Sequence, residues 1–159
     1  MPLIELLNNK PVLIGLHLGF AIAGIDAFFW LYWELATDFR SKKRAVLAAI
    51  SGTTAFVLSW LAGGYYYVFY YGKLVKPVIQ KGLAPWAHAI FMEAKEHIFL
   101  LIIPLAVTAA IAAFLNKEEL QALNLQKPLK YLTGLVVFFG LLIGLFGFII
   151  SAAARWGIK

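Results

Sequence analysis

Two histidines are the side chains whose type and spacing could do chemistry in this chain. His17 and His97 each lie near one end of an apolar segment long enough to cross a lipid bilayer. An ionisable residue inside a membrane span is costly and therefore usually serves a purpose. Two imidazoles that face each other across a helix bundle could hold a haem iron or another metal ion. The other interpretation is a structural bundle in which both histidines are simply hydrogen-bonded.

The absence of cysteine narrows this chemistry. Without cysteine the chain has no disulfide, no thiolate metal ligand and no haem attached covalently through a CxxCH motif. The sequence also contains no phosphate-binding loop, no nucleophile-plus-base signature and no nucleic-acid module. Noncovalent ligation by histidine is therefore the form of metal or haem binding that we expect here.

The composition is that of a membrane protein. Of the 159 residues, 62% are hydrophobic and 14% are charged, whereas soluble domains are about half apolar and about a quarter charged. The net charge of +6 comes from lysines and arginines scattered among the expected loops, as is usual for residues that flank membrane spans. We therefore expect the lipid bilayer, and not nucleic acid, to be the main partner of this surface.

Four segments are apolar enough for spanning helices, which need about 20 residues each. We expect one transmembrane domain with helices over residues 12–34, 45–67, 96–115 and 131–153. The third helix could start anywhere between Trp86 and Ile98, and Pro104 should kink it. The connections are expected over residues 36–44, 70–85 and 116–130. The sequence thus predicts an all-α, four-helix integral membrane bundle with both termini on one side.

The distribution of basic residues favours one orientation of this bundle in the membrane by a small margin. We name the side of the termini and of the second connection side A, and the opposite side, with the first and third connections, side B. Lysine and arginine divide seven to seven between the sides, although cytoplasmic loops are normally richer in them. The dense cluster over residues 40–44 favours side B as cytoplasmic. We therefore expect termini outside, in the inner or cell membrane of a bacterium or archaeon.

The spans place both histidines near side A. His17 lies about five residues into the first helix and His97 lies near the side A edge of the third. These two helices run in the same direction, and each residue advances a helix by about 1.5 Å. The two imidazoles should therefore lie at the same level to within about one helical turn.

Glycines on three helices lie at this level. Gly19 follows His17, Gly63 and Gly64 lie near the side A end of the second helix, and Gly144 lies in the side A half of the fourth. Glycine leaves space beside a helix, which a neighbouring helix or a flat macrocycle can fill. Ordinary helix packing is one explanation of this pattern. The other is that these four glycines line a bound cofactor.

A second group of polar residues precedes or begins the third span. Glu93 and His97 are one helical turn apart, whereas His88 and His97 are nine residues apart and so half a revolution out of phase. A straight helix cannot offer both histidines to one metal. The cluster of His88, Met92, Glu93, Glu96 and His97 could instead form a carboxylate–imidazole metal site, with His88 and Glu93 as ligands, or a proton path on side A. A solvated helix start, where glutamate is favourable, is the other interpretation.

Asp26 is an acid well inside the first span. No basic residue shares its level, although Thr53, Thr54 and Thr108 lie near it. It could relay protons between the histidine site and side B, or it could be an acid bonded to a hydroxyl group that helps the bundle to pack. The aromatic run over residues 65–71 should form an interfacial belt, and it could also line a quinone site.

At His17, Gly63, Gly64 and His97 the chain resembles the small four-helix membrane cytochromes b, in which helix-borne histidines ligate haem between glycine-notched helices. The resemblance is architectural and covers residues 12–153. It implies a single haem b ligated by His17 and His97. It also implies an electron-transport subunit that carries electrons between a membrane donor, such as quinol, and a redox partner on side A.

Two other classes of function stay open. One is a cofactor-free structural or assembly subunit of a larger membrane complex. The other is a membrane enzyme or transporter that uses a metal site of histidine and glutamate. The small size and the lack of a soluble domain favour a subunit of a membrane redox complex over a free-standing enzyme.

Overall fold

The computed structural model describes residues 5, 8–37, 39 and 41–156. Over these residues the chain forms α-helices and two π-helical segments and contains no strand. The all-α fold predicted from the sequence is therefore confirmed. The elements are α2 (Lys10–Ala36), α3 (Lys42–Tyr66), η1 (Tyr67–Val75), α4 (Lys76–Lys81), η2 (Ala87–Met92), α5 (Glu93–Ala112), α6 (Lys117–Ala122) and α7 (Gln126–Trp156).

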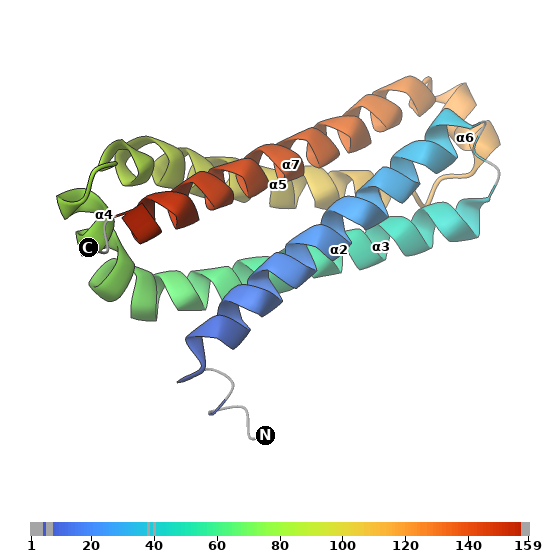
Figure 1. Ribbon diagram of the computed structural model, residues 1–159. Helices are drawn as coiled ribbons and strands as arrows, with labels where there is room; N and C mark the ends of the chain where they lie inside the picture. Colours follow the sequence, from blue (N-terminus) through green and yellow to red (C-terminus); the bar gives the residue numbers. More distant parts are fainter. Residues whose placement is uncertain (1–4, 6–7, 38, 40, 157–159) are drawn as a thin grey trace.

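Four helical stretches are long and apolar enough to cross a membrane. They are Lys10–Ala36, Lys42–Lys81, Ala87–Ala112 and Gln126–Trp156. Figure 1 shows the four long helices running lengthwise beside one another, with α2 crossing α3 obliquely. We name the end formed by η1, α4 and η2 the A end, and the end with α6 and the α2–α3 connection the B end. This arrangement is the expected four-helix membrane bundle.

The second connection differs from the prediction. Residues 70–85 were expected to join two spans, but the helix continues through η1 and α4 as far as Lys81. The lysines at 73 and 76 ended the apolar pattern without ending the helix, because a helix can extend beyond the hydrocarbon. Pro77 lies in the first turn of α4, at the junction where η1 changes to an α-helix, and the helix continues through it.

Side-chain caps explain where several helices begin. The Asn9 side chain accepts a hydrogen bond from the backbone N–H of Val12 at 3.3 Å, at the start of α2. Asn116 caps α6 by accepting from the Glu119 N–H at 2.8 Å, and the Glu119 carboxylate accepts from the Asn116 N–H at 2.7 Å. This reciprocal pair satisfies backbone groups that a helix start leaves open. A short helix therefore lies within the connection expected over residues 116–130.

Glycines bring α2 and α3 close together. A Cβ added at Gly24 would lie 2.9 Å from the Phe56 ring, and one added at Gly52 would lie 2.7 Å from the Phe28 ring. The two rings stack with their centroids 5.7 Å apart. Each phenylalanine therefore occupies space that a side chain on the facing helix would otherwise fill. Both glycines are required for this contact, as is usual where membrane helices approach closely.

The α2–α3 connection is fixed by a charged pair at the B end. Glu34 is buried, and its Oε1 lies 3.6 Å from the guanidinium of Arg44. Arg44 belongs to the basic cluster that favoured side B as cytoplasmic, whereas Arg40 of that cluster lies outside the described residues. The assignment of side B to the cytoplasm stays a prediction.

Candidate functional site

His17 lies on the face of α2 that packs against α3. Its Nδ1 is 2.9 Å from the Ser59 carbonyl oxygen and 3.0 Å from the Ser59 hydroxyl. That hydroxyl donates to the backbone carbonyl of His17 at 2.9 Å, so it is not the donor toward the ring. Nδ1 therefore carries the proton that is shared with Ser59, and in the neutral ring Nε2 keeps a free lone pair.

Gly63 makes this contact possible. A Cβ at position 63 would lie only 2.5 Å from Nδ1 of His17, so any side chain there would push the imidazole away from α3. The space beside Gly63 is thus occupied by His17 itself. At Gly19, Gly64 and Gly144, in contrast, an added Cβ would meet no atom within 4 Å. Of the four glycines predicted to line a cofactor, only Gly63 has a side chain of this chain in the space beside it.

Lys95 of α5 completes the surroundings of His17. Its Nζ lies 3.5 Å from Nε2 of His17 and 3.7 Å from the position of a Cβ at Gly147 on α7. The two basic side chains therefore meet between the helices. Sequence reasoning did not single out Lys95. The sequence could have indicated that Lys95 faces the bundle. Lys95 precedes the buried residues of α5 and continues their helical spacing of 4, 3, 4, 3. The other members of that stripe are Phe99, Ile102, Ala106 and Ala109.

His97 faces a different space. It is exposed, and its Nδ1 lies 2.7 Å from the carbonyl oxygen of Glu93 on the preceding turn. His97 follows Lys95 by two residues, which rotates it by about 200° on an α-helix and raises it by only about 3 Å. Because Lys95 points toward His17, His97 points away from it. The structure places the two histidines at a similar level but does not bring them together.

His88 belongs to a separate buried contact at the A end. It is only 4% exposed, and its Nδ1 lies 3.1 Å from the hydroxyl of Tyr71 in η1. Glu93, its predicted companion in a metal site, is exposed. Within the described ranges, no group of three or more His, Asp or Glu side chains is placed to hold a metal ion.

Tyrosine and glutamate side chains lie between the two histidine contacts. The Tyr67 side chain hydrogen-bonds to the Glu96 carboxylate, and its ring stacks on that of Tyr71 at 5.2 Å between centroids. The Oε1 atom of Glu96 is buried and has no hydrogen-bond partner among the residues that the structure describes. We define the polar line as the series of side chains that runs through the A half of the bundle from α2 to η2. Its members are His17, Ser59, Lys95, Glu96, Tyr67, Tyr71 and His88.

Asp26 lies outside this series. It is exposed on α2, and it follows His17 by nine residues, which places it half a revolution away on the opposite face. The hydroxyl of Thr53 donates to backbone carbonyls of α3 and α5 at 2.8 and 3.2 Å. That of Thr108 donates to the carbonyl one turn earlier at 2.8 Å. Both hydroxyls are thus used by the backbone, and the structure does not bring Asp26 to His17.

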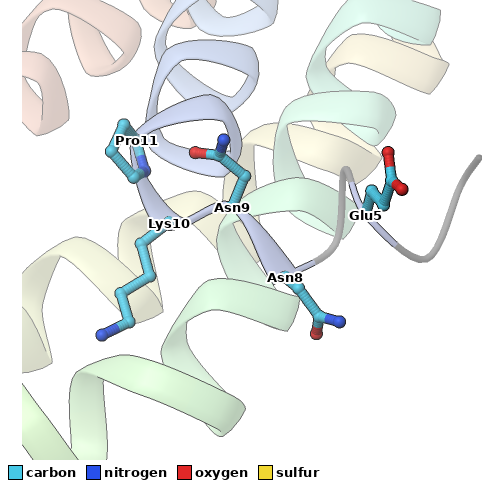
Figure 2. A pocket seen from close by; sticks show the side chains of 5 residues that line it. All are labelled: Glu5, Asn8, Asn9, Lys10 and Pro11. Carbon is cyan, nitrogen blue, oxygen red and sulfur yellow. The ribbon is translucent and has the colours of Figure 1, made fainter. Parts of the chain in front are cut away.

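A surface hollow lies at the start of α2, away from the polar line. Figure 2 shows the five side chains that line it, which are Glu5, Asn8, Asn9, Lys10 and Pro11. None of these belongs to the polar line, and Asn9 already serves as the helix cap of α2.

The members of the polar line share one chemical property, because imidazole, amine, carboxyl and phenol groups all exchange protons. The Nε2 atom of His97 could in addition ligate a metal, whereas that of His17 is in contact with Nζ of Lys95. No protein-family model, no curated protein and no solved structure matches this chain.

Proposed function

We propose that the protein conducts protons across a membrane, and that the polar line in the A half of the bundle forms the part of the path nearest the A end. The observation that carries this proposal is the contact between Lys95 and His17, whose nitrogens lie 3.5 Å apart between spanning helices. Two basic side chains in contact are unfavourable when both are charged. At least one of them is therefore neutral, and a proton can be exchanged between them.

The energetic cost of the polar line supports a functional role. A Lys or Asp at the centre of a spanning helix costs about 2.5–3.5 kcal/mol on insertion scales. Serine or threonine could hold helices together at lower cost. Lys95, Glu96 and His17 are instead placed in one region, which favours proton exchange over packing as the reason for their presence.

The backbone of the A end supports the same conclusion. Tyr67 and Tyr71 lie in η1, and His88 lies in η2, so both partners of the Tyr71–His88 contact come from π-helical segments. A π-helix is rare and is frequently found at functional sites. At the A end the two π-helical segments bring a tyrosine and a histidine together.

The test is proton flux into vesicles that contain the purified protein. The vesicles enclose a pH-sensitive dye, and a potassium gradient with valinomycin drives proton entry. We expect Lys95→Met and Glu96→Gln to lower the rate of acidification by roughly tenfold or more, equivalent to about 1.4 kcal/mol in the barrier. The matched control is His97→Ala, which removes an ionisable side chain of the same helix that lies outside the polar line.

Two results would contradict the proposal. One is a wild-type flux no greater than that of vesicles carrying the Lys95→Met, Glu96→Gln double variant. The other is a loss of flux in His97→Ala equal to that in Lys95→Met. Circular dichroism of each variant in detergent establishes that the helices are retained.

A second candidate is electron transfer through haem b in a membrane redox complex. The specific observation is that Nδ1 of both His17 and His97 contacts a backbone carbonyl, at 2.9 and 2.7 Å. Such a bond leaves Nε2 available in His97, as is common for metal-ligating histidines, whereas Nε2 of His17 lies 3.5 Å from Nζ of Lys95. Since the two rings face different spaces, one haem shared by both does not fit a single chain. A haem would be ligated by the exposed His97 together with a residue of another subunit.

The visible spectrum tests this second candidate. If haem binds, the reduced protein, purified from cells with an ample haem supply, shows the paired bands of a low-spin cytochrome b. Alanine at the ligating histidine removes them. A wild-type protein without these bands, purified with its membrane partners, excludes the haem proposal and leaves the proton-transfer proposal unaffected.

A further inference from the structure

Lys95 and His17 bring two basic nitrogens together between the spanning helices. Nζ of Lys95 lies 3.5 Å from Nε2 of His17, and Nδ1 of the same ring is already in contact with Ser59. An ammonium group offers three N–H donors and no acceptor, and a protonated imidazole donates from both nitrogens. The contact is therefore rich in hydrogen-bond donors and in positive charge.

Neither basic group has a carboxylate partner. Within the part of the chain that the structure describes, no carboxylate lies within ion-pair distance of Lys95 or His17. Glu96, the residue after Lys95, attracts the ammonium group only at longer range, and its carboxylate accepts a hydrogen bond from Tyr67. Charges inside a protein are normally paired. The described side chains thus leave open which negative charge accompanies these two nitrogens.

Gly147 of α7 leaves room beside the ammonium group. A Cβ added there would lie 3.7 Å from Nζ and 4.0 Å from Cε of Lys95, and it would meet no other atom of a neighbouring helix within 4 Å. The space is therefore large enough for one methyl-sized group, and Nζ is the nearest atom to it. A chloride ion is close to a methyl group in size, whereas carboxylate and phosphate groups are larger. The space beside Gly63, in contrast, is already occupied by the His17 ring.

We propose that Lys95, His17 and Gly147 form a binding site for one small monovalent anion, such as chloride. The anion lies in the space beside Gly147 and accepts hydrogen bonds from Nζ of Lys95 and Nε2 of His17. Basic side chains select anions in the same way in membrane pores. One negative charge offsets the repulsion between the two basic groups, so both can carry a proton while the anion is bound. One proton is therefore taken up together with each anion.

This inference goes beyond the proposed function and can fail separately from it. Anion binding is measured on the purified protein at equilibrium, without a membrane or a gradient, whereas proton conduction is measured as flux into vesicles. Proton flux without chloride binding would overturn the anion site alone. Chloride binding without proton flux would support the anion site and contradict proton conduction.

NMR of the chloride ion tests the site, because bound chloride broadens the resonance of the free ion. The protein is purified in an uncharged detergent. We expect greater broadening with the wild-type protein than with Lys95→Met, which removes the charge and keeps a long side chain. Broadening that remains in Lys95→Met comes from lysines and arginines at the surface. Bromide should displace the bound chloride, whereas gluconate, which is too large for the space beside Gly147, should not.

Gly147→Ala tests the space without removing a charge. Its Cβ would be in ordinary contact with Lys95, so the helices should be retained, and we expect chloride to bind at least about tenfold more weakly. Gly144→Ala, on the same helix, is the matched control, because its Cβ would meet no atom within 4 Å, and it should bind chloride as the wild type does. Circular dichroism verifies the fold of each variant.

Two results would overturn the anion site. One is a wild-type broadening no greater than that of Lys95→Met. The other is an equal affinity for chloride in Gly147→Ala and the wild type, which would show that the anion does not lie beside Gly147.

Discussion

The B half and the A half of this bundle are built from the same helices, but different side chains lie between the helices in the two halves. In the B half the space is filled by alanine and phenylalanine, with Phe28, Ala48, Ala106 and Ala109 fully buried on regular α-helices. In the A half it contains the polar line, and the backbone is π-helical in two segments. The B half can therefore supply a rigid frame, while the A half departs from regular geometry where ionisable groups meet.

In both halves a glycine on α3 makes room for a side chain of α2, but that side chain differs between the halves. At Gly52 in the B half it admits the phenyl ring of Phe28, at 2.7 Å from the position of a Cβ. At Gly63 in the A half it admits the imidazole of His17, at 2.5 Å. Both contacts lie between α2 and α3. The same packing principle thus serves stability at one end and positions an ionisable group at the other.

The largest effect is expected from overfilling the B half. Ala106 is fully buried, so Ala106→Leu should lower the free energy of unfolding by about 1–3 kcal/mol, as is usual when methylenes are forced into a packed core. Val107→Leu, at the next position and exposed to lipid, is the matched control. Thermal unfolding in detergent measures both variants. Equal stability of the two would contradict the description of the B half as closely packed.

Substituting neighbouring glycines sharpens the description of the A half. Gly63→Ala should displace the His17 ring from Ser59 and lower proton flux by roughly tenfold, because the new Cβ would lie 2.5 Å from Nδ1. Gly64→Ala should leave the flux unchanged, since its Cβ would meet no atom within 4 Å. The vesicle assay compares the two variants. Identical flux in both would show that the position of His17 does not limit proton transfer.

A smaller effect is expected from the serine hydroxyl. Ser59→Ala removes the hydrogen bond from Oγ to the His17 carbonyl, at 2.9 Å, but leaves the Ser59 carbonyl in contact with Nδ1. We expect a loss of about 0.5–1.5 kcal/mol in the free energy of unfolding. Ser51→Ala is the control, because that hydroxyl bonds only to the local Ala48 carbonyl, at 3.2 Å. A greater loss in Ser51→Ala would contradict a special role for Ser59.

Labelling identifies the side of the membrane on which the A end lies, with no expected effect on stability. Lys81→Cys and Glu118→Cys place single thiols at the A and B ends, both exposed. If side B is cytoplasmic, a membrane-impermeant maleimide labels only Lys81→Cys in intact cells. Labelling of Glu118→Cys alone would reverse the orientation.

The sequence was sufficient for the fold because apolar windows of spanning length determine it. It was not sufficient for the site, because a shared depth does not specify the direction of a side chain. His97 was paired with His17 by depth, yet it is Lys95, on the buried stripe with Phe99, that meets His17. A comparison of angular phase along α5 would have distinguished them.

The same limit applies to the end of the second span and to Asp26 on the first. The extension to Lys81 depends on π-helical turns, which have no clear sequence pattern. The outward position of Asp26 follows from the way α2 packs on α3, where Gly24 and Phe28 determine the inner face. Neither feature is fixed by residue type, because each depends on the contacts between helices.

The close packing of α2 on α3 has a consequence for biogenesis. These helices are consecutive, and the Phe28–Phe56 stack and the His17–Ser59 bonds both lie within this pair. A hairpin of the first two spans can therefore assemble in the translocon before α5 is synthesised. The imidazole then enters the bilayer with Nδ1 already bonded, and the arrival of α5 brings Lys95 to the remaining nitrogen.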